Sequence, residues 1–244
     1  MSLLVSLQSA GYGTRFGEET PKALLPLGSG VILDYVIDWV GSVADGIYIS
    51  VNQRFEHSYR EWAKGKGVKI LVEGHKKPHE DTTGSVGGIQ NFLKYLEESG
   101  QKPDGVLLAA TDELFGFSCA DFAEFQKTKD SSAVLSRELD SLEEARNYGI
   151  VRANSAGRVL ECEEKPKKPK SKSALHFCYI FTRSSFPHIS SFRSRRKDAA
   201  ADMVDYVAKR VDVFEFPYPR NATYFHITDA ASYRAAKEFF ERPD

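Results

Sequence analysis

Two cations and three glycines near the N-terminus lie close enough together to bind phosphate. Arg15 and Lys22 belong to a loop that follows a short apolar run, and the glycines are Gly11, Gly13 and Gly17. Glycine allows positive φ and close approach of the backbone to a ligand. Free backbone amides beside cations make a cradle for phosphate groups. The segment therefore predicts a phosphate-binding loop rather than an ordinary turn after a strand.

Two widespread phosphate loops do not match this segment. The Gly-Lys-Ser/Thr ending of a P-loop is absent. A dinucleotide fingerprint needs Gly-x-Gly-x-x-Gly and an acidic residue after the second strand. Here the third glycine, Gly17, comes one residue late, and the expected second strand ends in Asn52 and Gln53. The pattern disfavours a hydride-transferring enzyme.

A second group of polar residues follows another apolar run. Thr111, Asp112 and Glu113 come directly after residues 106–110, which have the composition of a central parallel strand. Ligands of open α/β sheets bind beyond the carboxyl ends of the strands. A carboxylate there can hold Mg²⁺ together with substrate phosphates, or it can simply cap a helix. We expect Asp112 to be a metal ligand, with Glu113 as a weaker candidate.

The N-terminal segment resembles the signature of the nucleotidylyltransferases that join an NTP to a sugar 1-phosphate. The resemblance rests on Ser9-Ala10-Gly11, Gly13-Thr14-Arg15, Pro21-Lys22 and Leu24-Leu25-Pro26. The loop between Arg15 and Lys22 is shorter than in the enzymes for deoxythymidine diphosphate glucose or GDP-mannose. Its length is similar to that of uridylyltransferases for amino sugars and of the cytidylyltransferase of isoprenoid synthesis. The base and the sugar therefore stay open.

The resemblance implies roles for residues in the first half of the chain. Arg15 and Lys22 would be catalytic, and Asp112 would bind Mg²⁺, although Thr111 replaces the family's glycine before it. A glycine-rich turn at residues 82–88 would approach the base, although its hydroxyls could equally be helix caps. Gln8 could read the base edge or satisfy strand-end backbone groups. The implied nucleotide-binding residues are Ala10, Gly11, Gly13, Thr14, Gly84 and Gly87, and Gln8, where the family usually has an apolar residue, is a further candidate.

The second half carries the motifs that line the sugar 1-phosphate pocket in the family. They are Tyr148-Gly149-Ile150-Val151, Gly157-Arg158-Val159 and Glu163-Glu164-Lys165-Pro166. The resemblance implies that Tyr148, Gly149, Glu164 and Lys165 bind the sugar phosphate. A carboxylate at 164 could accept bonds from sugar hydroxyls, and the cation at 165 could meet the phosphate. The basic residues after Pro166 are expected in a solvated loop.

One departure bears directly on catalysis. In Tyr224-Phe225-His226, the histidine stands where the family has a second metal-binding aspartate. Imidazole suits softer ions than Mg²⁺, so Mn²⁺ or Co²⁺ becomes an alternative. His226 could instead donate to phosphate, or it could mark a protein without turnover.

The elements that must position these residues follow from hydrophobic periodicity. Strand-like and helical patterns alternate, which predicts a Rossmann-like α/β fold with a mixed, mostly parallel sheet and helices on both faces. Strands are expected at residues 3–7, 46–51, 68–72, 106–110, 133–136, 148–152, 158–162, 177–182 and 211–216. Helices are expected at residues 32–40, 56–64, 84–96, 121–127, 199–209 and 230–240. We expect one domain over residues 1–244, with a nucleotide half to about residue 114 and a sugar half after it.

Composition excludes several other classes. The net charge of −1 gives no bulk attraction to nucleic acid or anionic membrane, and no apolar run has the length of a membrane span. Three cysteines without metal spacing read as reduced thiols, which favours the cytoplasm. An oligomer is possible.

The sequence thus favours a Mg²⁺-dependent enzyme that makes an NDP-sugar and pyrophosphate from an NTP and a sugar 1-phosphate. Two alternatives remain open. One is a cytidylyltransferase for a non-sugar alcohol phosphate, suggested by the short loop. The other is a catalytically silent regulatory protein that binds nucleotide sugars, suggested by His226.

Overall fold

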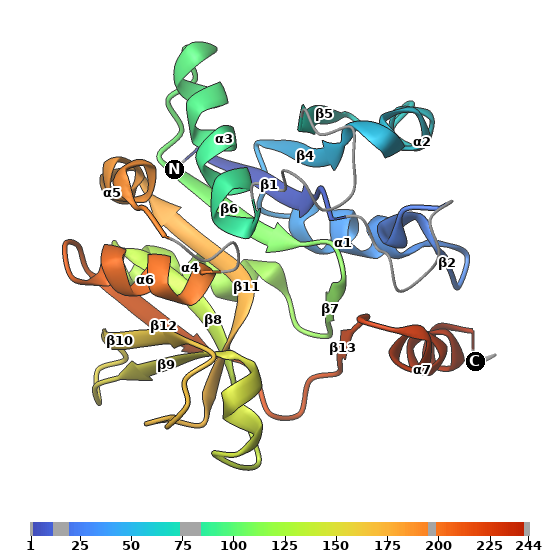
Figure 1. The fold of residues 1–244 in the computed structure, drawn as a ribbon. Coiled ribbons are helices and arrows are strands. Elements are labelled where there is room, and N and C mark those ends of the chain that lie inside the picture. Colours follow the sequence, from blue (N-terminus) through green and yellow to red (C-terminus); the bar gives the residue numbers. More distant parts are fainter. Residues whose placement is uncertain (1, 12–19, 74–83, 195–198, 242–244) are drawn as a thin grey trace.

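A nine-stranded mixed sheet forms the centre of the molecule (Figure 1). The computed structural model describes residues 2–11, 20–73, 84–194 and 199–241. In the first half, β1 (Leu3–Ser9) pairs in parallel with β4 (Gly46–Asn52) and with β6 (Gly105–Ala110). β5 (Val68–Glu73) continues the parallel sheet beyond β4. The carboxyl ends of β1 and β6 therefore meet at one edge.

The second half joins the same sheet through one long antiparallel strand. β11 (Ser173–Thr182) pairs with β8 (Ser132–Glu138) on one side. On its other side it pairs with β9 (Gly149–Ala153) near its start and with β6 towards its end. β10 (Val159–Glu164) extends the sheet beyond β9, and β12 (Val213–Pro217) lies parallel to β8. One sheet thus spans both halves of the chain.

Helices cover both faces of the sheet, as period-2 alternation in the strands requires. Leu3, Val5 and Leu7 of β1 belong to one hydrophobic cluster, whereas Leu4 belongs to the other. The first cluster is completed by α1 (Ile32–Gly41), α2 (Glu56–Trp62), α4 (Cys119–Lys129) and α7 (Ala230–Phe240). The second contains α3 (Gly84–Glu98), α5 (Phe186–Ser191) and α6 (Ala200–Ala208). The predicted three-layer architecture is confirmed.

Two short ribbons were not predicted from the sequence. β7 (Glu113–Phe115) pairs with β13 (Tyr224–His226) in antiparallel register, and β2 (Pro26–Leu27) pairs with β3 (Gly30–Val31). Two or three residues are too few to show a periodicity. Short 3-10 turns lie at Lys22–Leu24, Gln53–Phe55, Glu144–Asn147 and Arg183–Ser185.

The predicted strands and helices all occur, with shifted ends. The largest difference is β11, which begins at Ser173 rather than at residue 177. The helix α5 was missed because its six residues are too few for a helical repeat. The three cysteines are buried free thiols, and no helix within the described residues has the length and apolarity to cross a bilayer. The division near residue 114 stays a prediction.

Candidate active site

A cavity of about 630 Å³ opens at the carboxyl ends of β1 and β6 and reaches into the second half of the chain. Its volume is in the range of pockets that take a whole small-molecule ligand. The lining includes most of the predicted site residues that the structure describes: Gln8, Ala10, Gly11, Lys22, Gly84, Asp112, Tyr148, Gly149, Glu164, Lys165 and His226.

Among the predicted residues that the structure describes, Gly87 does not line the cavity. Gly87 lies within α3 and is absent from the lining, where Ser85 stands with Gly84. Gly13, Thr14 and Arg15 lie outside the described residues. The role of Arg15 as the second cation of the phosphate loop therefore stays a prediction.

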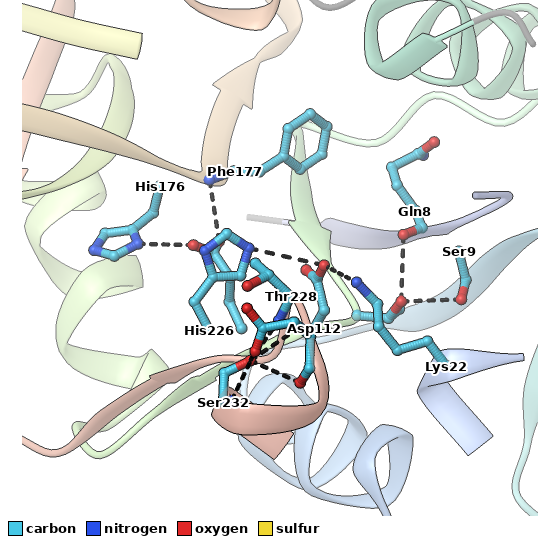
Figure 2. A network of polar contacts seen from close by, with 12 residues as sticks. Gln8, Ser9, Lys22, Asp112, His176, Phe177, His226, Thr228 and Ser232 are labelled. Carbon is cyan, nitrogen blue, oxygen red and sulfur yellow. Dashed lines mark hydrogen bonds and ion pairs between the residues drawn. The ribbon is translucent and has the colours of Figure 1, made fainter. Parts of the chain in front are cut away.

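Asp112 is the meeting point of two cationic or potentially cationic groups. Lys22 Nζ lies 2.5 Å from Asp112 Oδ2, and His226 Nε2 lies 3.8 Å from the same oxygen. Figure 2 shows the two side chains reaching this carboxylate from opposite sides. Lys22 and Asp112 keep about a fifth of their side-chain surface exposed, at 23% and 21%. The three groups can therefore meet a ligand in the cavity.

His226 reaches this position through the β7–β13 ribbon. His226 pairs with Glu113 in the ribbon, and the backbone N–H of Ile227 donates to the carbonyl of Asp112 at 2.8 Å. Two residues further on, Asp229 caps α7 by accepting from the backbone N–H groups of Ala231 and Ser232. Residues more than a hundred positions apart are thereby held side by side.

The Asp112–His226 pair can be tested as a site for a divalent ion. Ligand bonds of about 2.1 Å place neighbouring donors roughly 3–4 Å apart, and the separation of 3.8 Å fits. One carboxylate oxygen and one imidazole nitrogen suit Mn²⁺ or Co²⁺ at least as well as Mg²⁺. The described residues contain no cluster of three or more His, Cys, Asp or Glu that could hold a metal ion. A metal here would need phosphate oxygens of a substrate to complete its ligand set.

Glu113, beside Asp112 in the chain, faces a separate buried network. Its Oε1 lies 2.9 Å from His176 Nδ1 and accepts from the Tyr224 hydroxyl at 2.7 Å. Its Oε2 accepts from the backbone N–H of Phe177 at 3.1 Å. Burial disfavours the charged carboxylate, but the electrostatic interaction with His176 and these hydrogen bonds outweigh it and lower the pKa of Glu113 to about 2. This carboxylate is engaged by the protein and is a poor candidate for a metal ligand.

Hydroxyl groups join the ends of β1 and β6. Ser9 Oγ lies 2.5 Å from the Tyr59 hydroxyl and 2.9 Å from Thr111 Oγ1, and Thr111 also donates to the carbonyl of Gln8. Burial raises the pKa of Tyr59 to about 12, so this hydroxyl stays protonated. The network fixes the backbone from which Ala10 and Gly11 enter the phosphate loop.

Gln8 has one structural role and one free face. Its Nε2 donates to Ser6 Oγ at 2.8 Å, and a Cβ added at Gly88 of α3 would lie 2.2 Å from its Oε1. A side chain at position 88 would therefore displace the amide group of Gln8 from its present position. Gln8 also lines the cavity, so both the structural and the base-reading interpretation remain compatible with its position.

The predicted sugar-binding residues are tied to the start of α6. Glu164 Oε2 accepts from the backbone N–H of Ala201 at 3.3 Å, and a Cβ added at Gly149 would lie 2.8 Å from Ala201 Cβ. Lys165 has a φ of 48°, which is unusual for a residue with a side chain, and its N–H donates to the carbonyl of Tyr148. Such backbone strain concentrates at functional sites. The four residues form one wall of the cavity.

Several lining residues were missed by the sequence reasoning, among them Arg137, His176, Phe177 and Tyr224 as a buried partner of Glu113. Arg137 and His176 each lie within a β-strand, where a single polar residue reads as a solvent-facing position. Their common location becomes visible only in the fold, where β8 and β11 pair with each other.

Comparison with known proteins assigns the chain to a family. The family model described as Nucleotidyl transferase matches residues 7–222. The chain therefore belongs to the nucleotidyl transferase family, and the predicted resemblance is confirmed.

Two relatives show which enzymes of the family the chain is similar to. Glucose-1-phosphate adenylyltransferase of Fervidobacterium nodosum is 23% identical over 236 residues, covering 86% of this chain and 55% of the relative. The enzyme of the same name from Ruminiclostridium cellulolyticum is 27% identical over 199 residues, covering 75% and 46%. The chain thus spans about half the length of these relatives.

The structural similarity extends over the whole of a related chain. UDP-glucose pyrophosphorylase, solved in complex with UDP-glucose, superposes with a TM-score of 0.79 and 16% identity, covering 98% of each chain. At this identity the likeness shows the fold, and it agrees with the three-layer architecture.

The buried Glu113 carboxylate predicts a pH-dependent contribution to stability. The folded pKa of about 2 lies below the usual 4.5, so the stabilisation is present above pH 4.5 and is lost as the pH falls towards 2. We expect Glu113→Gln to lower the free energy of unfolding by roughly 3 kcal/mol at pH 7. Urea denaturation at several pH values between 7 and 3 measures the difference from wild type, which should shrink towards the acid end.

The control is Glu61→Gln, an exposed carboxylate paired with Lys64. It should change stability little at any pH. A Glu113→Gln protein as stable as wild type at pH 7 would contradict the role given to the buried carboxylate.

Proposed function

We propose that the protein is a nucleotidylyltransferase that joins an NTP to a sugar 1-phosphate and releases pyrophosphate. The observation that carries this proposal is the single cavity that brings Lys22 and Asp112 together with the Tyr148–Gly149 and Glu164–Lys165 pairs. The first group suits nucleotide phosphates, and the second suits a hydroxylated, phosphorylated acceptor. Relatives named glucose-1-phosphate adenylyltransferase support the sugar phosphate as acceptor.

The proposed reaction requires that the two substrates are positioned and that the charge on the reacting phosphates is stabilised. A phosphate oxygen of the acceptor attacks the α-phosphorus of the NTP in line, the bond to the pyrophosphate breaks, and pyrophosphate carries the electron pair away. Lys22 is placed to stabilise charge on the α-phosphate, and the amides of the glycine loop with Arg15 would hold the leaving pyrophosphate. The second-half residues hold the acceptor close to its target.

Asp112 and His226 are the groups that would hold a divalent ion. Such an ion would supply charge neutralisation of the reacting phosphates. Because the amino group of Lys22 competes with the ion for the same Asp112 oxygen, Lys22 would turn to the nucleotide phosphates when the ion binds. We propose that the ion is Mg²⁺, with Mn²⁺ or Co²⁺ favoured to the extent that His226 coordinates it.

A second candidate function is binding of nucleotide sugars without turnover. It is favoured by the histidine that stands beside Asp112, where the sequence pattern leads one to expect a carboxylate. Release of pyrophosphate from each of the four NTPs, with a panel of sugar 1-phosphates and with Mg²⁺, Mn²⁺ or Co²⁺, tests the main proposal. Thermal shift with the same ligands runs in parallel. Stabilisation without turnover under every condition would favour the silent protein, and turnover only with a non-sugar alcohol phosphate would favour the other alternative.

Lys22 should be required for turnover and not for folding. Lys22→Ala removes charge stabilisation at the reacting phosphates, so kcat should fall by roughly 10²-fold or more. The melting temperature should stay close to that of wild type, because Lys22 lies at the cavity surface. Lys64→Ala, which removes an exposed partner of Glu61, is the matched control and should keep its activity. A Lys22→Ala protein with wild-type kcat would remove this residue from the mechanism.

His226 should set the metal preference. If it is a ligand, the wild type should need high Mg²⁺ or favour Mn²⁺ or Co²⁺, and His226→Asp should lower the Mg²⁺ concentration that gives half-maximal activity. Metal titrations of both proteins at fixed pH measure this. If His226 instead donates to phosphate, the aspartate variant should lose activity with every metal, because it places an anion beside phosphates.

A further inference from the structure

One cation of the cavity belongs neither to the phosphate loop nor to the Glu164–Lys165 motif. Arg137 lies near the end of β8, and its side chain lines the cavity with 26% of its surface exposed. The guanidinium carbon lies 5.1 Å from the centre of the Tyr148 ring and 5.6 Å from that of the Tyr224 ring. These distances are typical of cation–π contacts. The two rings therefore hold the guanidinium group in place.

The guanidinium group has a weak protein partner among the described residues. Its closest carboxylate oxygen is Oε1 of Glu144, at 3.7 Å from Nη2, which is longer than a hydrogen bond. Among the residues that the structure describes, the Arg137 side chain has no hydrogen-bond partner, although its guanidinium group carries five N–H donors. A largely buried guanidinium group of this kind is suited to an anion with two acceptor oxygens.

The two tyrosines place Arg137 between the two ends of the cavity. Tyr148 precedes Gly149 in the predicted sugar-binding wall, and Tyr224 lies two residues before His226. The Tyr224 and His226 ring centres are 6.5 Å apart, and His226 Nε2 lies 3.8 Å from Asp112. Arg137 thus contacts Tyr148, which belongs to the predicted sugar-binding wall, and Tyr224, which lies towards Lys22 and Asp112.

In the proposed reaction, only one group of the acceptor has to lie at this position. The sugar ring would bind at the Tyr148 wall, and the α-phosphate of the NTP would lie near Lys22. The acceptor phosphate connects the two, because one of its oxygens attacks the α-phosphorus. We propose that Arg137 binds the phosphate group of the acceptor, an inference that rests on the proposed function.

This role explains why the cavity needs a further cation. Two anionic phosphates must approach each other, Lys22 lies at the nucleotide side, and Lys165 of the predicted sugar-binding wall supplies one positive charge for the acceptor. A guanidinium group can hold two non-attacking oxygens of the acceptor phosphate and leave the third free to react. Since this contact exists before and during the reaction, its loss should weaken acceptor binding more than it lowers kcat.

The test compares Arg137→Gln and Arg137→Lys with wild type. Calorimetry measures the affinity for the sugar 1-phosphate that binds wild type most tightly, and for the preferred NTP. Steady-state assays give KM for both substrates. We expect Arg137→Gln to weaken sugar 1-phosphate binding by roughly 10- to 100-fold, with NTP binding within about twofold of wild type. Arg137→Lys should recover part of the loss, because it keeps the charge.

Arg152→Gln is the matched control. Arg152 lies on β9, which pairs with β11 as β8 does. Its side chain is 45% exposed and pairs with Glu161 at 3.2 Å, and Arg152 is not among the residues that line the cavity. This variant should bind both substrates as wild type does. Thermal melts of all variants detect a purely structural effect.

Three results would overturn the inference. They are unchanged sugar 1-phosphate binding in Arg137→Gln, an equal loss for both substrates, or an Arg137→Lys protein as impaired and as destabilised as the glutamine variant. Failure of the proposed function looks different. A wild type that binds sugar 1-phosphates but releases no pyrophosphate is not the proposed enzyme, while a selective loss of binding in Arg137→Gln would still uphold the inference. A wild type that binds no sugar 1-phosphate overturns both.

Discussion

The geometry of the candidate site depends on the buried carboxylate of Glu113. It receives hydrogen bonds from β11, through the backbone of Phe177, and from β13, through the Tyr224 hydroxyl. Because Glu113 begins β7, these bonds fix the strand that follows Asp112 directly. His226 pairs with Glu113 across the ribbon, and the N–H of Ile227 donates to the carbonyl of Asp112, so the strands that this carboxylate ties down also hold His226 beside Asp112. A charge buried in one half of the chain thereby positions groups from both halves.

The strands of the sheet and the motifs that line one wall of the cavity could be found from the sequence, because both depend on local patterns. Apolar runs in the sequence identified β1 and β6, and the strand-end rule predicted that Lys22 and Asp112 lie at the same edge of the sheet. The motifs at Tyr148 and Glu164 likewise lie on one wall of the cavity. The spacing of glycines shows that a helix can approach closely without showing which glycine faces a ligand, so the role of Gly87, which does not line the cavity, stays a prediction.

The rest could not be predicted because it depends on pairing between distant segments. β7 and β13 contain three residues each, and their register is fixed by tertiary hydrogen bonds rather than by any repeat. Arg137 looks like a solvent-facing residue within β8, and only the fold shows that Tyr148 and Tyr224 enclose its guanidinium group. From the sequence, Glu113 was a weaker candidate for a metal ligand, and only the fold shows that its carboxylate contacts His176.

The shared oxygen of Asp112 links nucleotide binding to the state of the site. Lys22 and His226 both approach Asp112 Oδ2, so the carboxylate is neutralised within the protein before any phosphate arrives. An arriving NTP offers Lys22 a second anionic partner. Because an ammonium group has three donors in a compact head, Lys22 can turn from the carboxylate to a phosphate with a small movement. That movement would free Oδ2 for a divalent ion at the moment when phosphate oxygens become available to complete its ligand set. In the proposed reaction, Lys22 and His226 would therefore both affect how Asp112 takes up a divalent ion.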